Sequence, residues 1–419
     1  MFSLRPVKIN TVTHTTKSNH RQPVPFFVPE PLWPVQWAIQ EEMYLFEQEV
    51  AKSYPNKAKV TLADGKTLLM FGSYSYLGLL QHPVIDRAAM EAVRNFGSGT
   101  HGVRLLTGTI SLHKQLEQRI SRFVGHPEAI VFASGYMTNL SVITALVSRG
   151  DYILLDQLSH ASIYDGCRLS GAKSIRFKHN DMGDLEQKLA KLPRAANKLV
   201  LTDGVFSMDG DIVDLPAIVD IAHQYGALLA VDEAHSIGVL GDAGLGVEEY
   251  FGLKAGSIDI KIGTLSKAIP SMGGYVAADG QLIELIKHQG RSFIYSASLA
   301  PPLAAAALAA FDVIEQEGWR IRQLHKNSHY LKQALDGMGF NTLSTSTAIF
   351  PICCGNNETA WRMAKYCQDR GILVQGIPSP VVPEGMARLR CIVTADHTIG
   401  DLDHCLAVLG EAGKRFKLI

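Results

Sequence analysis

Between Ala129 and Ala278 the chain repeats one pattern, a short apolar run followed by an amphipathic stretch. The apolar runs are AIVF, YILL, SIRF, KLVLTD, ALLAVDEAH, IDIKIGTLSK and GGYVA. Runs of this length, separated by helix-like segments, are typical of βα units around a mostly parallel sheet. Such a sheet binds ligands at the carboxyl ends of its strands, so the polar residues that end each run are the first candidates for a site.

The rest of the chain predicts smaller units around this α/β domain. After Pro302 an Ala- and Leu-rich helix leads to the runs AIFPICC, GILVQGI and ARLRCIV, which indicates a small α+β domain. Apolar residues recur at roughly helical spacing from Pro31 to Tyr54, which predicts a docking helix. Because 419 residues exceed the usual size of one compact domain, we expect several parts. These are an N-terminal arm and docking helix over 1–60, a large domain over 61–300 and a small domain over 301–419.

Composition excludes several classes of protein. Lys plus Arg equals Asp plus Glu at 40 each, which leaves no global charge to attract nucleic acid or an acidic membrane surface. Six cysteines without a CxxC pair fit neither a disulfide framework nor a zinc module, and favour a reducing compartment. No apolar run approaches the length of a membrane span. Together with the cysteine pattern, this leads us to expect a cytoplasmic protein without a metal site. In the acid-free first 29 residues, Pro6, Pro23 and Pro25 favour a flexible arm over an amphipathic transit peptide.

Two residues at strand ends indicate cofactor chemistry. Lys267 ends the run GTLSK, and a partly buried lysine with a lowered pKa is what imine formation with an aldehyde needs. A solvated lysine is the ordinary alternative. Asp232 follows five apolar residues, and a buried carboxylate there needs a partner such as the protonated nitrogen of a pyridine ring. A helix N-cap is the ordinary alternative for Asp232.

Two histidines and one glycine-containing turn extend this set. His235 lies three residues after Asp232, in reach of a ring hydroxyl, and His160 is an aromatic side chain that can lie flat on a pyridine. Either histidine alone is more often structural, and their joint placement favours a site. The turn SGY at 134–136 precedes an apolar helix, where exposed backbone N–H groups form a ready site for a phosphate. An ordinary tight turn is the alternative.

A nucleotide-driven motor is a competing interpretation, because residues 232–235 spell DEAH. Such motors need a phosphate-binding loop of the form GxxxxGK[ST]. The nearest approach is GKT at 65–67, where Val60 stands in place of the first glycine and the segment lies outside the βα array. We therefore exclude a motor.

From about Gly72 to His397 the chain carries stretches that recur, in the same order and spacing, in one enzyme family. They are GSYSYLGL, GSGTHGVRLLTGTISLHKQLE, SGYMTNL, HASIYDGC, GVFSMDGD, VDEAHSIGVLG, GTLSKA, SASLAPP and PVVPEGMARLR. The chain resembles the α-oxoamine synthases, which include serine palmitoyltransferase, 2-amino-3-ketobutyrate ligase, 8-amino-7-oxononanoate synthase and 5-aminolevulinate synthase. The resemblance implies the α/β, fold-type I fold of pyridoxal-phosphate transferases, which is aspartate aminotransferase-like. It pairs a large domain around a mostly parallel sheet with a small α+β C-terminal domain.

The resemblance also assigns roles to residues. Lys267 is expected to hold pyridoxal 5′-phosphate (PLP) as an imine and then act as a base, Asp232 to bind the pyridine nitrogen, and His235 to contact the ring oxygen. His160 is expected to stack on the ring and completes the catalytic set. The residues expected to bind the cofactor are Ser134, Gly135, Tyr136, His160, Ser207, Asp232, His235, Thr264, Lys267, Ser296 and Ser298. The last two are expected to reach the phosphate from the partner subunit of a homodimer.

Two departures from the family pattern concern the substrate. Some members hold the substrate carboxylate with an arginine of an RPP-type segment, whereas Pro378 stands at that place here. Other members use the final arginine of a motif like ARLR, so Arg390 is the candidate for bidentate pairing with the carboxylate. Arg388 is the alternative and can instead be a surface or core-edge residue. Ser75 replaces the asparagine of an NYLGL-type motif and is a further candidate for substrate contact.

The activity that the resemblance implies is decarboxylative condensation of an amino acid with an acyl thioester, carried by coenzyme A or by a carrier protein, to give an α-amino ketone. HASIYDGC, GYMTNL and GSYSYLGL look most like serine palmitoyltransferases, whereas PVVP and ARLR look like the glycine-using ligase and aminolevulinate branches. The alternatives are an aminotransferase or aldolase of the same fold, and a noncatalytic subunit of a heteromeric synthase. Retention of Lys267, Asp232 and both histidines disfavours the noncatalytic subunit.

Overall fold

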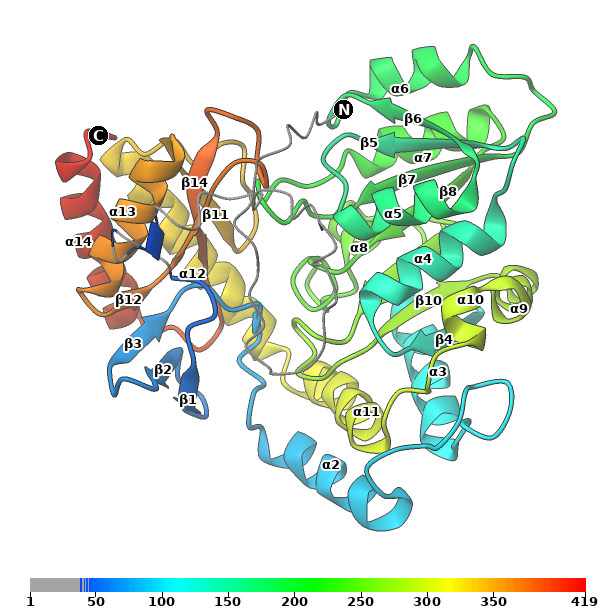
Figure 1. Ribbon diagram of the computed structural model, residues 1–419, viewed down its shortest axis with the longest axis horizontal. Coiled ribbons are helices and arrows are strands. Elements are labelled where there is room, and N and C mark those ends of the chain that lie inside the picture. The colour runs from blue at the N-terminus through cyan, green and yellow to red at the C-terminus, as the bar shows by residue number, and fades with distance from the viewer. Residues whose placement is uncertain (1–37, 40, 42, 44) are drawn as a thin grey trace, which may run out of the picture.

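The computed structural model describes residues 38, 39, 41, 43 and 45–419. They form a large part built on a broad sheet and a smaller part that contains the C-terminal helix (Figure 1). No helix among these residues is long and apolar enough to cross a membrane. All six cysteines of the sequence are free thiols.

The large part is built on a seven-stranded sheet with the order β4-β10-β9-β8-β7-β5-β6. Its strands are β4 (Glu128–Phe132), β5 (Tyr152–Asp156), β6 (Lys173–Phe177), β7 (Lys198–Asp203), β8 (Leu228–Asp232), β9 (Ile260–Thr264) and β10 (Gly274–Ala278). The strands from β9 to β6 run parallel, and β10 is antiparallel to both of its neighbours. Each apolar run of the repeated pattern forms one of these strands, so the predicted α/β fold with a mostly parallel sheet is confirmed.

Both faces of this sheet are buried, because its side chains alternate between two separate apolar clusters. Along β7, Leu199 and Leu201 belong to one cluster and Val200 to the other. The helices of this part are α3 (Ser111–Val124), α4 (Gly135–Leu146), α5 (Ala161–Ser170), α6 (Met182–Leu189), α7 (Leu215–Gln224), α8 (Val247–Tyr250), α9 (Gly280–Gln289) and α10 (Arg291–Ile294). Burial on two faces explains why the strands read as continuous apolar runs.

The smaller part contains two small sheets. The strands β11 (Ile349–Gly355), β14 (Ala387–Ile392) and β13 (Gln375–Ile377) form one antiparallel sheet in the order β11-β14-β13. The strands β1 (Val50–Ser53), β2 (Lys59–Leu62), β3 (Thr67–Met70) and β12 (Ile372–Leu373) form the other. The helices α12 (Trp319–Met338), α13 (Asn357–Gln368) and α14 (Ile399–Arg415) complete this part. Together these elements form the predicted α+β arrangement.

The helix predicted between Pro31 and Tyr54 does not reach its expected end, because Val50–Ser53 forms the strand β1. Its backbone pairs antiparallel with β2, and this pairing prevails over a helical spacing of apolar residues. The predicted arm, and residues 1–37, 40, 42 and 44 in general, lie outside the described residues.

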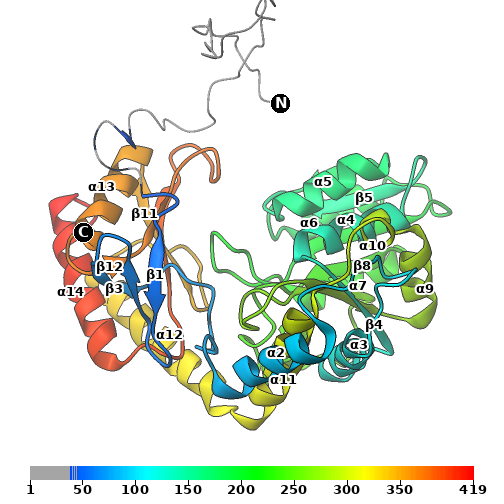
Figure 2. The ribbon, with the colours of Figure 1, turned by 60° about the horizontal axis from the view of Figure 1, so that its bottom comes forward.

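The strand β3 pairs in parallel with β12, so residues 67–70 share a sheet with the C-terminal part of the chain. The domain boundaries at 61 and 301 remain a prediction. Between the two parts, α2 (Pro83–Phe96) packs beside α11 (Pro301–Gln316), and α11 leads into α12 (Figure 2).

Candidate active site

A cavity of about 230 Å³ lies at the carboxyl ends of the parallel strands β7, β8 and β9. Nine predicted site residues line it: Ser134, Gly135, Tyr136, His160, Ser207, Asp232, His235, Thr264 and Lys267. They converge although they are far apart in the sequence, because the carboxyl ends of parallel strands meet at one edge of a sheet. Sequence reasoning missed four further polar residues of the lining, namely Asn139, Ser162, Asp203 and Ser266.

The amine of Lys267 is largely removed from bulk water at this edge. Burial lowers the pKa of Lys267 to about 8, although the carboxylates of Asp232 and Asp203 act in the opposite direction. The Lys267 Nζ lies 5.8 Å from the centroid of the Tyr74 ring. A lysine with this pKa provides a neutral, nucleophilic amine near neutral pH, which is the form that reacts with an aldehyde.

Asp232 is buried and held by two donors. Its Oδ2 accepts a hydrogen bond from Asn139 Nδ2 at 2.8 Å, and its Oδ1 accepts one from the backbone N–H of Ala234 at 3.0 Å. The same Asn139 amide donates to Ser162 Oγ at 2.9 Å, and this hydroxyl lies 2.7 Å from His160 Nδ1. One side chain of α4 therefore fixes both the carboxylate and the imidazole that are expected to face a pyridine ring.

His235 is held between two tyrosines of the loop after β3. The Tyr76 hydroxyl lies 2.7 Å from His235 Nδ1, and the rings of Tyr74 and His235 pack edge to face with centroids 5.6 Å apart. Burial keeps the pKa of His235 well below its usual value, and the cations of Lys267 and Arg390 add to this effect. His235 is therefore neutral at pH 7, and Nε2 is the ring nitrogen that can contact a group in the cavity.

The N-terminus of α4 also lines the cavity, through Ser134, Gly135 and Tyr136. Ser134 caps this helix, and its Oγ accepts a hydrogen bond from the N–H of Met137 at 3.2 Å. Gly135 packs closely on β9 and β10, since a Cβ there would lie 3.1 Å from Thr264 Oγ1 and a Cβ on Gly274 would lie 2.6 Å from the Gly135 Cα. Backbone N–H groups at a helix N-terminus, beside a threonine hydroxyl, suit a phosphate.

A second buried acid, Asp203, lies beside Asp232. The two are paired across β7 and β8, and Asp203 Oδ2 accepts a hydrogen bond from the backbone N–H of His160 at 3.1 Å. Burial, together with the charge of Asp232, raises the pKa of Asp203 well above its usual value. Asp203 ends the run KLVLTD, so the strand-end rule that selected Asp232 applied to it as well.

The residues of this cavity fit PLP. The donors at one end match its phosphate, the carboxylate of Asp232 matches a protonated ring nitrogen, and the amine of Lys267 matches its aldehyde. The two imidazoles lie on the same lining. The set combines an anion site, an acid and a reactive amine within one small volume.

The two arginines of β14 have different partners. Arg388 forms an ion pair with Asp209, and its Nη1 also donates to the carbonyl of Met208 at 3.1 Å. Arg390 donates from Nη2 to the Tyr74 hydroxyl at 2.7 Å, while its buried Nε has no hydrogen-bond partner among the described residues. No carboxylate of the described chain lies within ion-pair distance of Arg390. Arg390 is therefore the arginine that is free to pair with a substrate carboxylate.

Four predicted residues are not among those that line the cavity in the described chain, namely Arg390, described above, and Ser75, Ser296 and Ser298. Ser75 faces another cavity of about 270 Å³ with Tyr54 and Asp396, so this geometry gives no support to its expected contact with substrate. Ser296 Oγ lies 3.7 Å from Met137 Sδ, and Ser298 Oγ donates to the Gly102 carbonyl at 3.1 Å. A contribution of these two serines to a partner's phosphate site remains a prediction.

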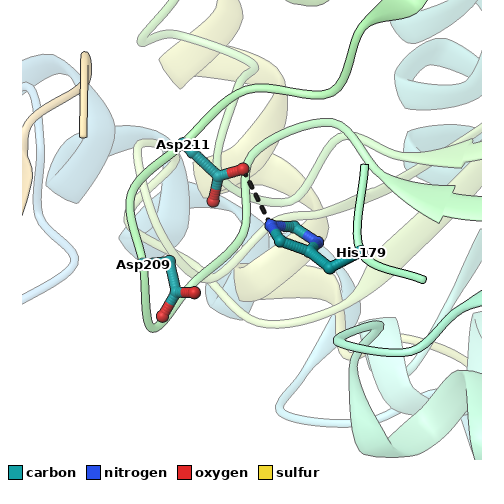
Figure 3. Close-up of side chains that lie close together, drawn as sticks. All are labelled: His179, Asp209 and Asp211. Carbon is teal, nitrogen blue, oxygen red and sulfur yellow. Dashed lines mark hydrogen bonds and ion pairs between the residues drawn. The ribbon is translucent and has the colours of Figure 1, made fainter. Parts of the chain in front are cut away.

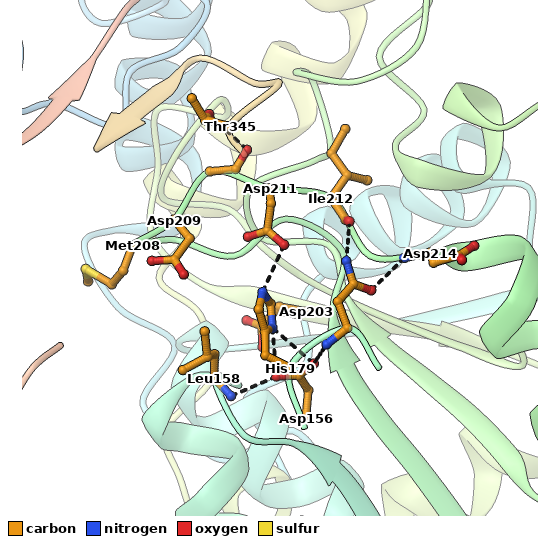
Figure 4. Close-up of polar contacts among 12 residues, drawn as sticks. Asp156, Leu158, His179, Asp203, Met208, Asp209, Asp211, Ile212, Asp214 and Thr345 are labelled. Carbon is orange, nitrogen blue, oxygen red and sulfur yellow. Dashed lines mark hydrogen bonds and ion pairs between the residues drawn. The ribbon is translucent and has the colours of Figure 1, made fainter. Parts of the chain in front are cut away.

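His179 forms a cluster with Asp209 and Asp211, two acids of the loop after β7 (Figure 3). The two ring nitrogens of His179 contact Asp211 Oδ2 at 2.9 Å and Asp156 Oδ1 at 3.1 Å (Figure 4). Burial acts to lower the pKa of His179, but the two carboxylates outweigh it and raise the pKa to about 10. Because protonated His179 and Arg388 already pair with these acids and with Asp209, we interpret the cluster as structural ion pairs.

Comparisons with known proteins agree with this geometry. Residues 66–409 match the family described as aminotransferase class I and II. The chain is 45% identical to an 8-amino-7-oxononanoate synthase of Geobacter sulfurreducens, over 92% of this chain and 98% of the relative. It is 44% identical to a serine palmitoyltransferase of Sphingobacterium spiritivorum, over 85% of this chain and 89% of the relative. The solved serine palmitoyltransferase of S. paucimobilis, with PLP and myriocin bound, matches with a TM-score of 0.88 and 35% identity, over 92% of this chain and 97% of that one.

Proposed function

Because the chain belongs to the class I and II aminotransferase family, and within it to the α-oxoamine synthases, we propose that it condenses an amino acid with an acyl thioester and releases carbon dioxide. The product is an α-amino ketone. The chain is a PLP-dependent enzyme with a fold-type I fold. Within this reaction class we propose a serine palmitoyltransferase-like version, which the similarity to solved serine palmitoyltransferases supports.

The observation that supports this function most directly is the relation of Arg390 to Lys267. Both lie beside the Tyr74 ring, whose centroid is 5.0 Å from the Arg390 guanidinium carbon and 5.8 Å from Lys267 Nζ. A guanidinium without an acidic partner and an amine of lowered pKa thus share one aromatic neighbour. An α-amino acid needs such a pair of groups, one for its carboxylate and one near its Cα.

We assign the residues of the cavity to the cofactor as follows. Asp232, held by Asn139, contacts the ring nitrogen, and the turn at 134–136 with Thr264 contacts the phosphate. His160 covers the ring and His235 contacts its oxygen. When bound, PLP supplies an electron sink for negative charge at the substrate Cα.

The side chains of the protein orient the substrate, remove its Cα proton and exclude water. Arg390 orients the amino acid by holding its carboxylate in a bidentate pair. The neutral amine of Lys267 removes the Cα proton and retains it, which its pKa of about 8 permits near neutral pH. Burial of His235 and Asp232 excludes water from this side of the cavity and strengthens both contacts.

We also propose a homodimer in the cytoplasm. The family resemblance supports a dimer in which Ser296 and Ser298 face the neighbouring site. The six free thiols support a reducing compartment. Analytical ultracentrifugation of the holoenzyme tests the dimer, and a monomer at working concentration would contradict it.

A matrix of amino acids against acyl thioesters tests the reaction. Serine, glycine and alanine are each combined with coenzyme A thioesters from acetyl to stearoyl and with the same acyl groups on a carrier protein. We expect carbon dioxide and free thiol in equal amounts, together with the mass of an α-amino ketone. Lys267→Ala is the control and should show neither product. Transfer of the amino group to a keto acid, without release of thiol, would instead establish an aminotransferase.

A further inference from the structure

Tyr74 lines a second cavity of about 380 Å³ and also neighbours residues of the cofactor cavity. Its ring lies 5.8 Å from Lys267 Nζ and packs edge to face on His235, and both of these residues line the cofactor cavity. Gln375 lines the second cavity as well, and both Tyr74 and Gln375 accept hydrogen bonds from Arg390 Nη2. The second cavity therefore begins where the substrate carboxylate is expected to bind.

The lining of the second cavity is mainly apolar. Its apolar side chains come from the segment 43–50, from β3, from α13 and from the β12–β13 region, and they are Met43, Leu45, Phe46, Val50, Met70, Trp361, Ala364, Leu373 and Val374. Among the described residues that line it, Glu47 is the one charged side chain, and it is exposed. The volume falls within the range of roughly 300–1,000 Å³ that is usual for small-molecule pockets.

We propose that this second cavity binds the hydrocarbon chain of the acyl thioester, a proposal that rests on the function proposed above. The thioester carbonyl must come within bonding reach of the substrate Cα, between Lys267 and Arg390. From that point the acyl chain passes Tyr74 and enters an apolar volume, where burial of each methylene is favourable. The cavity selects acyl thioesters by chain length and by the polarity of the chain end.

The charge of the lining identifies the kind of chain. A chain that ends in a carboxylate would bury its charge without a cation in the described lining, and Glu47 would repel it. An uncharged alkyl end meets neither cost. We therefore expect the enzyme to prefer an uncharged acyl chain over an ω-carboxylated chain of the same length.

A third cavity, of about 460 Å³, provides a control. It is larger and also mainly apolar, but its lining contains neither Tyr74 nor Gln375 and includes Lys332 and His325. The exposed Ser346 lies on this lining, so Ser346→Phe fills the control cavity in the way that Ala364→Phe fills the second cavity.

Two variants narrow the second cavity to different extents. Ala364→Phe replaces a fully buried methyl group of α13 with a ring. Gly72→Ala is gentler, because the added Cβ would meet Gln375 Cγ at 3.5 Å and Met70 Sδ at 3.8 Å, which are ordinary contacts. If a thermal melt shows that Ala364→Phe does not fold, Gly72→Ala decides the question.

The measurement is kcat/KM of the holoenzyme for coenzyme A thioesters from acetyl to stearoyl, with the amino acid that the wild type accepts. We expect Ala364→Phe to lower the ratio of palmitoyl to acetyl kcat/KM by about tenfold or more, Gly72→Ala to lower it less, and Ser346→Phe to leave it unchanged. An unchanged ratio in both cavity variants, or an equal shift in Ser346→Phe, overturns the acyl site. A wild type that consumes none of the thioesters instead overturns the proposed function itself.

Discussion

Arg388 of β14 and Asp209, in the loop after β7, form an ion pair between the small and the large part of the molecule. The adjacent Met208 extends this link, because its carbonyl accepts a hydrogen bond from Arg388 and its Sδ lies 3.7 Å from Arg390 Nη1. The same loop contributes Ser207 to the cofactor cavity and is anchored by His179 through Asp211 (Figure 4). The position of Arg390 relative to the cofactor therefore depends on this loop.

Removal of the Asp209 charge should destabilise the protein, because Arg388 would remain buried without a counter-charge. For Asp209→Asn we expect the free energy of unfolding to fall by about 2 kcal/mol or more, together with a rise in the KM for the amino acid. Urea denaturation of Asp209→Asn, Arg388→Met and the double variant measures the coupling. The double variant should lose less than the sum of the single losses, and additive losses would show that the two side chains do not interact.

Arg390 and Arg388 should respond differently to substitution by lysine. Lysine cannot form a bidentate fork with a carboxylate, so Arg390→Lys should raise the KM for the amino acid on the order of tenfold to a hundredfold. Arg388→Lys should chiefly lower stability, because Arg388 already has its partner in Asp209. Steady-state kinetics and thermal melts of both variants test this contrast. A larger KM effect in Arg388→Lys would reverse the assignment.

The lowered pKa of Lys267 predicts how the apoenzyme takes up PLP. Only the neutral amine attacks an aldehyde, and its fraction rises about tenfold per pH unit below the pKa. The rate of uptake should therefore rise with pH and level off above about pH 8. With an ordinary lysine the rate would continue to rise up to about pH 10.5. Stopped-flow absorbance of apoenzyme mixed with PLP measures the profile, and Lys267→Ala should show no covalent uptake. A rate that still rises above pH 9 contradicts the predicted burial.

Asn139 should affect cofactor binding through its hydrogen bond to Asp232. In Asn139→Ala the Oδ2 of Asp232 loses its donor while it stays buried, which costs about 1–3 kcal/mol. We expect the affinity for PLP to fall by about tenfold or more. Ser162→Ala is the matched control, because it breaks the link to His160 and leaves the bond to Asp232 intact. Equal losses of PLP affinity in both variants would mean that the link to His160 matters as much as the bond to Asp232.

The strand-end residues could be predicted from the sequence, whereas their supporting contacts could not. Asp232 and Lys267 follow apolar runs, and parallel strands bring such positions to one edge whatever the intervening chain does. The bond from Asn139 to Asp232 spans 93 residues and the bond from Arg390 to Tyr74 spans 316, and no local pattern marks either pair.

One prediction failed, and another gains no support from the structure, for the same reason. In the irregular loop after β3 no period decides which side chains face the site, and the loop presents Tyr74 and Tyr76 to it in place of Ser75. The helix expected up to Tyr54 yields to β1, whose pairing with β2 is likewise a non-local contact. In both cases tertiary contacts prevail over the local pattern of the sequence.

The ion pairs of His179 should make the stability of the protein depend on pH. In the folded state the carboxylates of Asp156 and Asp211 raise the pKa of His179 to about 10, against an ordinary value of 6.5. The folded state therefore binds the proton more tightly than the unfolded state. The resulting stabilisation is fully present below pH 6.5, declines above it and is lost as the pH rises through about 10.

We expect His179→Gln to lower the free energy of unfolding by an amount on the order of a few kcal/mol at pH 6, and by much less at pH 10. Urea denaturation of the wild type and of this variant across that range measures the difference. His223→Gln is the matched control, because His223 pairs with Asp259 at a more exposed position, where an ion pair contributes little. A difference between wild type and His179→Gln that stays constant from pH 6 to pH 10 would show that His179 stabilises the loop by packing, for example through its edge-to-face contact with Phe206, and not by its charge.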